Sequence, residues 1–171
     1  MTRELEQLAT IDALTGLANR RHLLKLTERE VRRADRHDRP LAMLLLDLDE
    51  FRRVNDTRGH TAGDVALHAF AALCRNAMRT IDLVGRLGGE EFAIVMPDTE
   101  IAAAQLVAER IRRTAAETPI RHDSGEFVVT VSIGIAARAG DGADRLFARA
   151  YKALYAAKHA GRNTIIVDHG W

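Results

Sequence analysis

Segments with hydrophobic residues at helical spacing alternate with shorter, continuously apolar runs along this 171-residue chain. Apolar or small residues that recur three or four positions apart predict four helices, because such residues line one face of a helix. They are Leu23, Thr27, Val31 and Ala34 in the first helix, Leu67, Phe70, Cys74 and Met78 in the second, Ile101, Ala104, Ala108, Ile111 and Ala115 in the third, and Leu146, Ala150, Ala153, Leu154 and Ala157 in the fourth. The second helix is expected over 62–78. Pro40 stops the first, since the residue before a proline disfavours helical geometry.

Shorter apolar runs between these helices predict strands. They cover 41–48, 82–87, 91–96, 127–137 and 164–167. The run at 41–48 is continuously apolar, which is typical of a central strand covered on both faces. The second and third runs are expected to form a hairpin that turns at Gly88-Gly89. Helices that alternate with strands around one hairpin predict an α/β fold, α+β-like, with a central mixed sheet surrounded by helices.

Length and composition favour one globular domain. Of the residues, 47% are hydrophobic, which suits a single sizeable core over 10–171. Residues 1–9 are expected to be the end of an N-terminal connecting helix, with a frayed terminus as the alternative. With 25 basic and 24 acidic residues, the net charge of +1 provides no global field for a nucleic acid or an anionic membrane. The sequence contains no apolar stretch long enough for a membrane span and no signal peptide, so we expect a cytoplasmic location.

Carboxylates stand where two of the predicted strands meet turns. Asp47 and Asp49 end the strand at 41–48, and alternation directs them to the same side, while Glu90 and Glu91 follow the glycine pair. If Asp47 and Glu91 converge, their repulsion raises their pKa values and opposes folding unless a cation lies between them. Acids at strand ends are often only solvated caps. Two pairs at one sheet edge favour a site for Mg²⁺ or Mn²⁺ instead.

The segment 51–64 is expected to be a polar loop that runs into the second helix. It contains Asn55 and Asp64, which could jointly read guanine, because the N1–H and the exocyclic amine need an acceptor while O6 or N3 needs a donor. The Asn-Asp pair at 55–56 is also common in turns. The chain has no Gly-x-x-x-x-Gly-Lys-Ser/Thr motif, so a P-loop is excluded and metal, backbone amides and scattered cations must hold any phosphates.

Five motifs occur in order between residues 10 and 167. They are Asp12-x-Leu14-Thr15-Gly16-Leu17-x-Asn19-Arg20-Arg21, Asp47-Leu48-Asp49-x-Phe51-x-x-x-Asn55-Asp56-x-x-Gly59-His60-x-x-Gly63-Asp64, Arg86-x-Gly88-Gly89-Glu90-Glu91-Phe92, Ser132-Ile133-Gly134, and Ala153-Leu154-Tyr155-x-Ala157-Lys158-x-x-Gly161-Arg162-Asn163. Together they resemble the GGDEF family of diguanylate cyclases, in which Glu90 is an accepted variant. The resemblance implies a fold like that of palm polymerases and nucleotidyl cyclases, with a GGEEF β-hairpin. It also implies that two GTP condense into cyclic di-GMP and two pyrophosphates.

The resemblance further implies a metal centre. Asp47 and Glu91 match metal ligands, assisted by the backbone carbonyl of Leu48. Glu90 falls where the family assists deprotonation of the ribose 3′-hydroxyl or binds a second metal, and the sequence does not separate these roles. The cofactor implied is Mg²⁺ or Mn²⁺, two per active site.

A substrate-binding set is implied as well. Asn55 and Asp64 match guanine readers, and Lys158 and Arg162 match cations that hold the terminal phosphates. The set is completed by Phe51, Arg52, Gly88 and Gly89. Arg52 departs from the family, in which Lys is usual, and a guanidinium is a forked donor rather than a point charge. Tyr151 is a second departure, because the family commonly carries an acid there.

One active site of this kind holds one GTP, so catalysis requires a homodimer with facing sites. Arg79-Thr80-Ile81-Asp82 lies shortly before the glycine pair, where the family has an Arg-x-x-Asp product-inhibition motif. Arg110 falls where a second arginine completes that allosteric site. The same motif could be only a solvated ion pair at a helix end. Alternatives to the enzyme are a catalytically silent receptor for cyclic di-GMP or GTP, an interaction module, and a cyclase with a different product.

Overall fold

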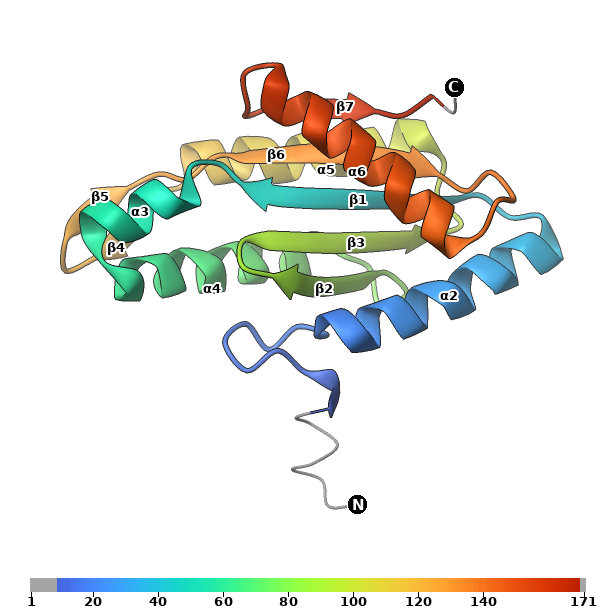
Figure 1. Ribbon diagram of the computed structural model, residues 1–171, viewed down its shortest axis with the longest axis horizontal. Helices are drawn as coiled ribbons and strands as arrows, with labels where there is room; N and C mark the ends of the chain where they lie inside the picture. Colours follow the sequence, from blue (N-terminus) through green and yellow to red (C-terminus); the bar gives the residue numbers. More distant parts are fainter. Residues whose placement is uncertain (1–8, 170–171) are drawn as a thin grey trace.

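A five-stranded mixed sheet forms the centre of the computed structural model, which describes residues 9–169 (Figure 1). Its strands are β1 (Leu41–Leu48), β2 (Leu83–Gly88), β3 (Glu91–Pro97), β6 (Val131–Ala137) and β7 (Ile165–Val167). They lie in the order β2-β3-β1-β6-β7, and only the β6–β7 pair is parallel. The predicted mixed sheet and hairpin are confirmed. The connecting helix predicted over 1–9 lies, apart from Ala9, outside the described residues.

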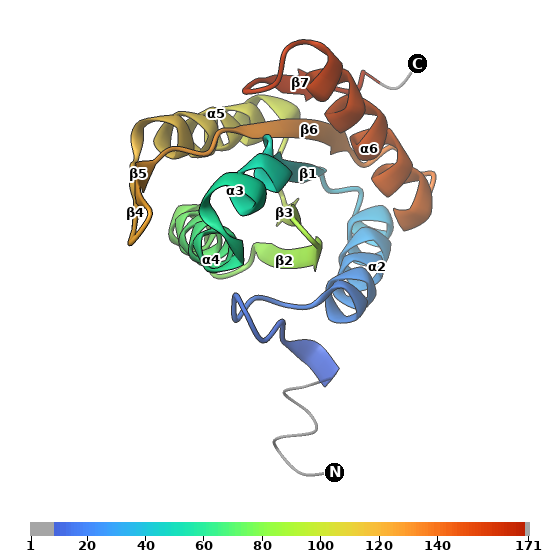
Figure 2. The ribbon, with the colours of Figure 1, turned by 60° about the vertical axis from the view of Figure 1, so that its left-hand side comes forward.

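Helices cover both faces of this sheet, which gives three layers (Figure 2). They are α2 (Arg20–His37), α3 (Phe51–Arg58), α4 (His60–Ala77), α5 (Ile101–Glu117) and α6 (Ala143–His159). Leu44 and Leu46 of β1 point into a core that they share with α4 and α5, while Met43 and Leu45 point to α2 and α6. Burial on both faces explains why the run at 41–48 is continuously apolar. None of the helices within residues 9–169 is long and apolar enough to cross a membrane.

The helix α6 lies directly on β6 at Gly134. A Cβ atom at this position would stand 2.2 Å from the backbone nitrogen of Leu154 and 2.4 Å from the carbonyl oxygen of Ala150. Only a residue without a side chain allows the two backbones to approach this closely. The glycine therefore sets the distance between α6 and the sheet.

The segment 51–64 is not the loop that its polarity predicted. It forms the short helix α3, in which Phe51 is buried, and Gly59 then separates α3 from α4. With φ 89°, Gly59 adopts a conformation that a residue with a side chain rarely takes, so the chain can turn and begin a second helix at once. Only one of the eight residues of α3 is buried, which explains why the sequence showed no helical spacing of apolar residues there.

Two turns also differ from their predictions. The β2–β3 hairpin turns at Gly89-Glu90 rather than at Gly88-Gly89, because Gly88 still pairs with Glu91 after an irregularity in β2. The strand predicted over 127–137 begins only at Val131. Before it, β4 (Ile120–His122) and β5 (Gly125–Phe127) form a separate two-stranded hairpin that was not predicted. Strands of three residues are too short for alternation to be recognised.

Candidate active site

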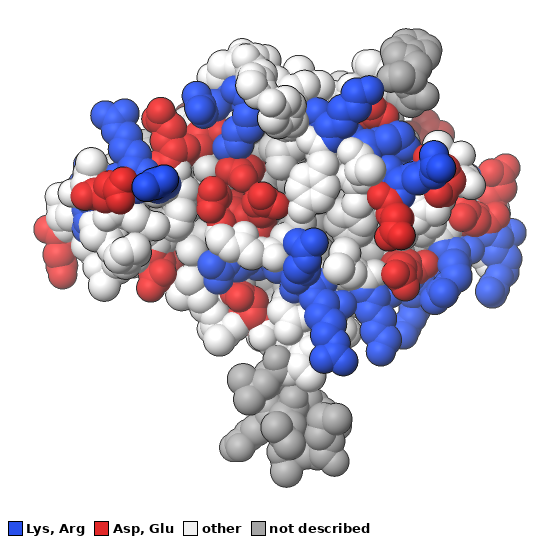
Figure 3. Space-filling view, in the orientation of Figure 1, with Lys and Arg blue, Asp and Glu red and all other residues white. Residues whose placement is uncertain are grey.

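Carboxylates from β1 and from the β2–β3 turn meet at one end of the sheet. Asp47 of β1 is the register partner of Glu91 at the start of β3. The backbone N–H of Leu48 donates to the carbonyl oxygen of Glu90 at 3.2 Å, which holds the turn against β1. Figure 3 shows acidic side chains gathered over this part of the molecule. The predicted convergence of Asp47 and Glu91 is therefore confirmed.

A lysine from α6 lies between two of these acids. The Nζ of Lys158 is 2.7 Å from Oδ1 of Asp47 and 2.8 Å from Oδ1 of Asp49. This shared contact confirms that Asp47 and Asp49 point to the same side. The resemblance assigned Lys158 to phosphates, whereas here its ammonium group neutralises part of the acid cluster.

Asp49 belongs to the predicted acid cluster, but the sequence analysis gave it no role of its own. Its carboxylate accepts hydrogen bonds from Ser132 Oγ at 2.6 Å, Thr130 Oγ1 at 2.7 Å and the backbone nitrogen of Asn163 at 2.9 Å. Burial alone would raise the pKa of Asp49, but these donors and Lys158 lower it below its usual value. Asp49 is thus a permanently ionised anchor for Lys158 and for the segment after α6. Its place two residues after Asp47, in a strand of alternating sides, was the available signal.

Asp47 has the opposite electrostatic environment. Burial, together with the charges of Glu90 and Glu91, outweighs the Lys158 ammonium group and raises the pKa of Asp47 to about 6. One ammonium group therefore does not compensate this cluster, and a further cation would stabilise it.

The candidate ligands fit a hard divalent cation. Carboxylate and carbonyl oxygens are available from Asp47, Glu90, Glu91 and Leu48. Within residues 9–169, no three Asp, Glu, His or Cys side chains are gathered closely enough to hold a metal ion by themselves. Mg²⁺ commonly binds one or two protein carboxylates and completes its shell with water and substrate phosphates. This donor set matches such a shared site rather than a closed protein cage.

The turn that carries Glu90 is fixed from outside the sheet. Arg86 of β2 donates through Nε to the carbonyl oxygen of Gly89 at 3.0 Å and through Nη1 to the Asp12 carboxylate. Asp12 in turn accepts from the backbone and the hydroxyl of Thr15. The first and third motifs of the sequence therefore form one structural unit, which holds the glycine turn in place.

Tyr151 of α6 also contacts the acid cluster. Its hydroxyl donates to Oε2 of Glu91 at 3.1 Å. The sequence analysis noted Tyr151 only as a departure from the family pattern. Its contact could not have been predicted, because sixty residues separate the two positions along the chain.

The α3–α4 corner carries the two predicted guanine readers. Oδ1 of Asn55 is buried and has no hydrogen-bond partner among the described residues. Gly63 makes room for it, because a Cβ atom there would lie 1.9 Å from Oδ1. Phe51 is buried beneath the same corner, and Asp64 is exposed on the first turns of α4. A buried acceptor without a partner is costly, so Asn55 is an unsatisfied polar group at this corner.

The other predicted substrate residues are more open. The side chain of Arg52 is 95% exposed and approaches only Asp56, at 3.9 Å. Arg162 is also exposed, in the turn after α6, and the described part of the chain gives its side chain no hydrogen-bond partner. Gly88 and Gly89 leave open space beside the turn, since a Cβ atom at either position would meet nothing within 4 Å. The structure thus brings Lys158 to the acids but leaves Arg52 and Arg162 apart from them.

The predicted allosteric motif forms a tight pair. Arg79 donates through Nη2 to Oδ1 of Asp82 at 2.8 Å and through Nε to Oδ2 at 3.1 Å. Only 1% of the Asp82 side chain is exposed, against 51% of the Arg79 side chain. Asp82 therefore orients Arg79 here and does not itself face solvent. Its predicted role as an acceptor for a guanine amine would require the pair to open.

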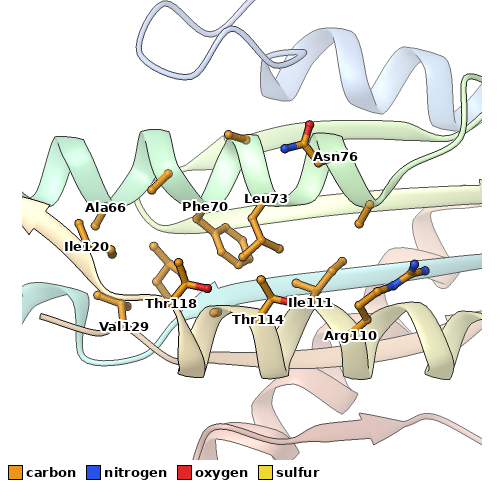
Figure 4. A pocket seen from close by; sticks show the side chains of 15 residues that line it. Ala66, Phe70, Leu73, Asn76, Arg110, Ile111, Thr114, Thr118, Ile120 and Val129 are labelled. Carbon is orange, nitrogen blue, oxygen red and sulfur yellow. The ribbon is translucent and has the colours of Figure 1, made fainter.

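Arg110 lies on α5, at the rim of a cavity of about 410 Å³ between α4 and α5 (Figure 4). Asn76 near the end of α4 lines the same cavity, three residues before Arg79. The floor is apolar and includes Phe70, Leu73 and Ile111. The exposed Arg110 guanidinium is thus on the same side of the molecule as the end of α4.

Comparisons with known proteins agree with this geometry. The family profile described as "Diguanylate cyclase, GGDEF domain" matches residues 9–164. The response regulator PleD of Caulobacter vibrioides is 43% identical over 164 residues, which cover 94% of this chain and 36% of PleD. The chain thus spans well under half the length of this curated relative.

Two solved structures illustrate the similarity in fold. The GGDEF domain of DgcB from Caulobacter crescentus, solved in complex with c-di-GMP, has a TM-score of 0.92 and 31% identity, and the match covers 95% of this chain and 94% of that one. The active GGEEF domain of a diguanylate cyclase from Vibrio cholerae has a TM-score of 0.84 and 33% identity, with 91% and 99% covered.

Proposed function

This chain belongs to the GGDEF domain family of diguanylate cyclases, and from that premise we propose that it condenses two GTP into cyclic di-GMP and two pyrophosphates. The observation that carries the proposal is the acid cluster. Asp47 and Glu91 meet on neighbouring strands, and burial, with the charges of Glu90 and Glu91 added to it, raises the pKa of Asp47 despite the contact with Lys158. Such a cluster suits the binding of a metal ion and a nucleoside triphosphate.

We assign the metal to Asp47, Glu91 and the carbonyl of Leu48, with Glu90 as a ligand of a second ion or as the group that accepts the 3′-hydroxyl proton. When bound, Mg²⁺ or Mn²⁺ would neutralise phosphate charge and lower the pKa of the attacking hydroxyl. The chain itself supplies position rather than covalent chemistry. Its rigid strand ends hold the reacting groups in line, which removes much of the entropic barrier.

The nucleotide is assigned to the α3–α4 corner. The Asn55 amide can donate to O6 or N3 of guanine, and the exposed carboxylate of Asp64 can accept from the N1–H and the exocyclic amine. Adenine lacks both donors at these positions, so this pair would favour GTP over ATP. Lys158 can keep its contact with Asp49 while its other N–H groups hold phosphate oxygens, with Arg162 and Arg52 as further cations.

We propose that two copies of the domain face each other during catalysis, because one such site holds one GTP and the nucleophile must come from a second GTP. We also propose that the product binds at Arg79 and Arg110. Asp82, the carbonyl oxygen of Pro97 and the hydroxyl of Thr99 engage Nε and Nη2 of Arg79, so that among the described residues only its Nη1 group is left to bind phosphate or the Hoogsteen edge of guanine. Binding there would favour an arrangement in which the catalytic faces are apart.

Incubation of the purified chain with GTP or ATP and Mg²⁺ or Mn²⁺, followed by chromatographic analysis of the nucleotides, tests this proposal. We expect cyclic di-GMP from GTP and no cyclic dinucleotide from ATP, with turnover abolished by Glu91→Gln. Binding of cyclic di-GMP without any turnover would indicate a silent receptor instead. Undiminished product from Glu91→Gln would contradict the metal assignment.

A further inference from the structure

Tyr151 supplies a hydroxyl that contacts Glu91 of the acid cluster. The phenol donates to Oε2 at 3.1 Å, and this contact leaves Oε1 of the same carboxylate without a hydrogen bond among the described residues. Glu91 is the first residue of β3, so its backbone is held by Asp47 on one side and Gly88 on the other. Its side chain has no comparable restraint apart from Tyr151.

The ring of Tyr151 also packs against the core. Tyr151 is half-buried against the core between α2, α6 and the sheet, and the positive charge of Arg20 at the start of α2 acts on its hydroxyl. Burial, and then the charge of Glu91, raises the pKa of Tyr151 above its usual value, whereas Arg20 acts in the opposite direction. The half-buried ring thus directs its hydroxyl at the Glu91 carboxylate.

We propose that Tyr151 is a positioning residue that fixes the Glu91 carboxylate with Oε1 turned toward the metal, and that Arg20 supports it. The inference rests on the proposed function only in treating Glu91 as a metal ligand. Partners that orient a ligating carboxylate commonly change metal affinity by about 10- to 100-fold when they are removed. A phenol does this without adding charge to a cluster that already has an excess of acids.

The competing explanation is that Tyr151 only packs its ring into the core. The hydroxyl oxygen distinguishes this packing role from the positioning role. Tyr151→Phe keeps the ring, and with it the contacts to the core, but removes the hydroxyl. The chain contains two tyrosines, both on α6. Tyr155 is 68% exposed and its ring lies against His159, so Tyr155→Phe is a matched control that removes a hydroxyl away from the acids.

The experiment measures Mn²⁺ binding rather than turnover. The wild type, Tyr151→Phe and Tyr155→Phe are saturated with 3′-deoxy-GTP, which lacks the attacking hydroxyl, and free Mn²⁺ is followed by electron paramagnetic resonance. We expect the dissociation constant for Mn²⁺ to rise roughly tenfold in Tyr151→Phe and to stay unchanged in Tyr155→Phe. Arg20→Met, which leaves the phenol in place, should give a smaller increase of about two- to threefold.

The outcomes separate this inference from the proposed function. Equal Mn²⁺ affinity in Tyr151→Phe and the wild type, with normal metal binding in both, would overturn the positioning role alone. A wild type that binds no Mn²⁺ with the nucleotide would overturn both the inference and the proposed metal centre. If Tyr151→Phe fails to fold, Arg20→Met decides, and an unchanged affinity in that variant overturns the proposal.

Discussion

Replacing Asp47 by Asn should stabilise the metal-free protein at neutral pH while it abolishes turnover. The pKa of this buried carboxyl is raised to about 6 in the folded chain, whereas its ordinary value is 3.8. The folded protein therefore disfavours the ionised form, and an amide of the same shape removes that cost. Oδ1 of the new Asn can still accept a hydrogen bond from Lys158.

The magnitude follows from the difference of roughly two pKa units, and each unit corresponds to about 1.4 kcal/mol. Ionised Asp47 should thus lower the free energy of unfolding by about 3 kcal/mol. Between about pH 4 and pH 6 the folded state binds more protons than the unfolded state, so stability falls as pH rises. Above pH 6 this contribution is constant. Below pH 4 it disappears, and the wild type and the variant should then be nearly equal.

Urea unfolding in the presence of EDTA, at a series of pH values from 4 to 8, measures this effect. The informative quantity is the difference between Asp47→Asn and the wild type, because other titrating groups cancel in it. Asp123, an exposed acid in the β4–β5 turn, offers the control Asp123→Asn, which makes the same substitution away from the acid cluster.

A difference that does not vary with pH would refute this reasoning. So would a variant that is less stable than the wild type at pH 7.5. Either result would mean that the Lys158 ion pair dominates the environment of Asp47. In a separate measurement, addition of Mg²⁺ with 3′-deoxy-GTP should raise the stability of the wild type but not that of Asp47→Asn, since a ligand stabilises only a protein that binds it.

Four further results are expected. Asp64→Ala should raise the KM for GTP more than it lowers kcat, at a cost of about 1–3 kcal/mol, and normal GTP binding with slow chemistry would contradict its role as a guanine reader. Specific activity should increase with enzyme concentration, and a constant value over a hundredfold dilution would argue against a transient dimer. Cyclic di-GMP should inhibit non-competitively at micromolar concentration, which corresponds to a binding free energy of about −8 kcal/mol, and Arg79→Ala should relieve the inhibition. Equal calorimetric affinity for cyclic di-GMP in the wild type and Arg79→Ala would show that Arg79 and Asp82 form only an ion pair. Gly134→Ala should lower the free energy of unfolding by about 1–3 kcal/mol or more, because its methyl would stand 2.2 Å from a backbone nitrogen, and a wild-type unfolding midpoint would contradict this.

The sequence predicted the parts of the fold that depend on long hydrophobic periods. The strand β1 and the helices α2, α4, α5 and α6 lie where their apolar residues indicated. The helix α3 was missed because a single buried residue, Phe51, gives no visible period. The β4–β5 hairpin was missed because each of its strands has only three residues.

The candidate site was predictable where its residues are adjacent in sequence or on a predicted hairpin. Alternation placed Asp47 and Asp49 on one side, and the glycine turn brought Glu91 to Asp47. The contacts of Lys158 with those acids join positions more than one hundred residues apart. No local pattern encodes such contacts, because they depend on how closely α6 packs on the sheet.

That packing distance has a mechanical consequence. The helix α6 carries both Tyr151, which contacts Glu91, and Lys158, which contacts Asp47, and it rests on β6 at Gly134. Both side chains are carried by one helix, which packs on β6, β1, β7 and α2. A load on the outer surface of α6 would displace both side chains in the same movement. The site would consequently gain or lose its two contacts from α6 together.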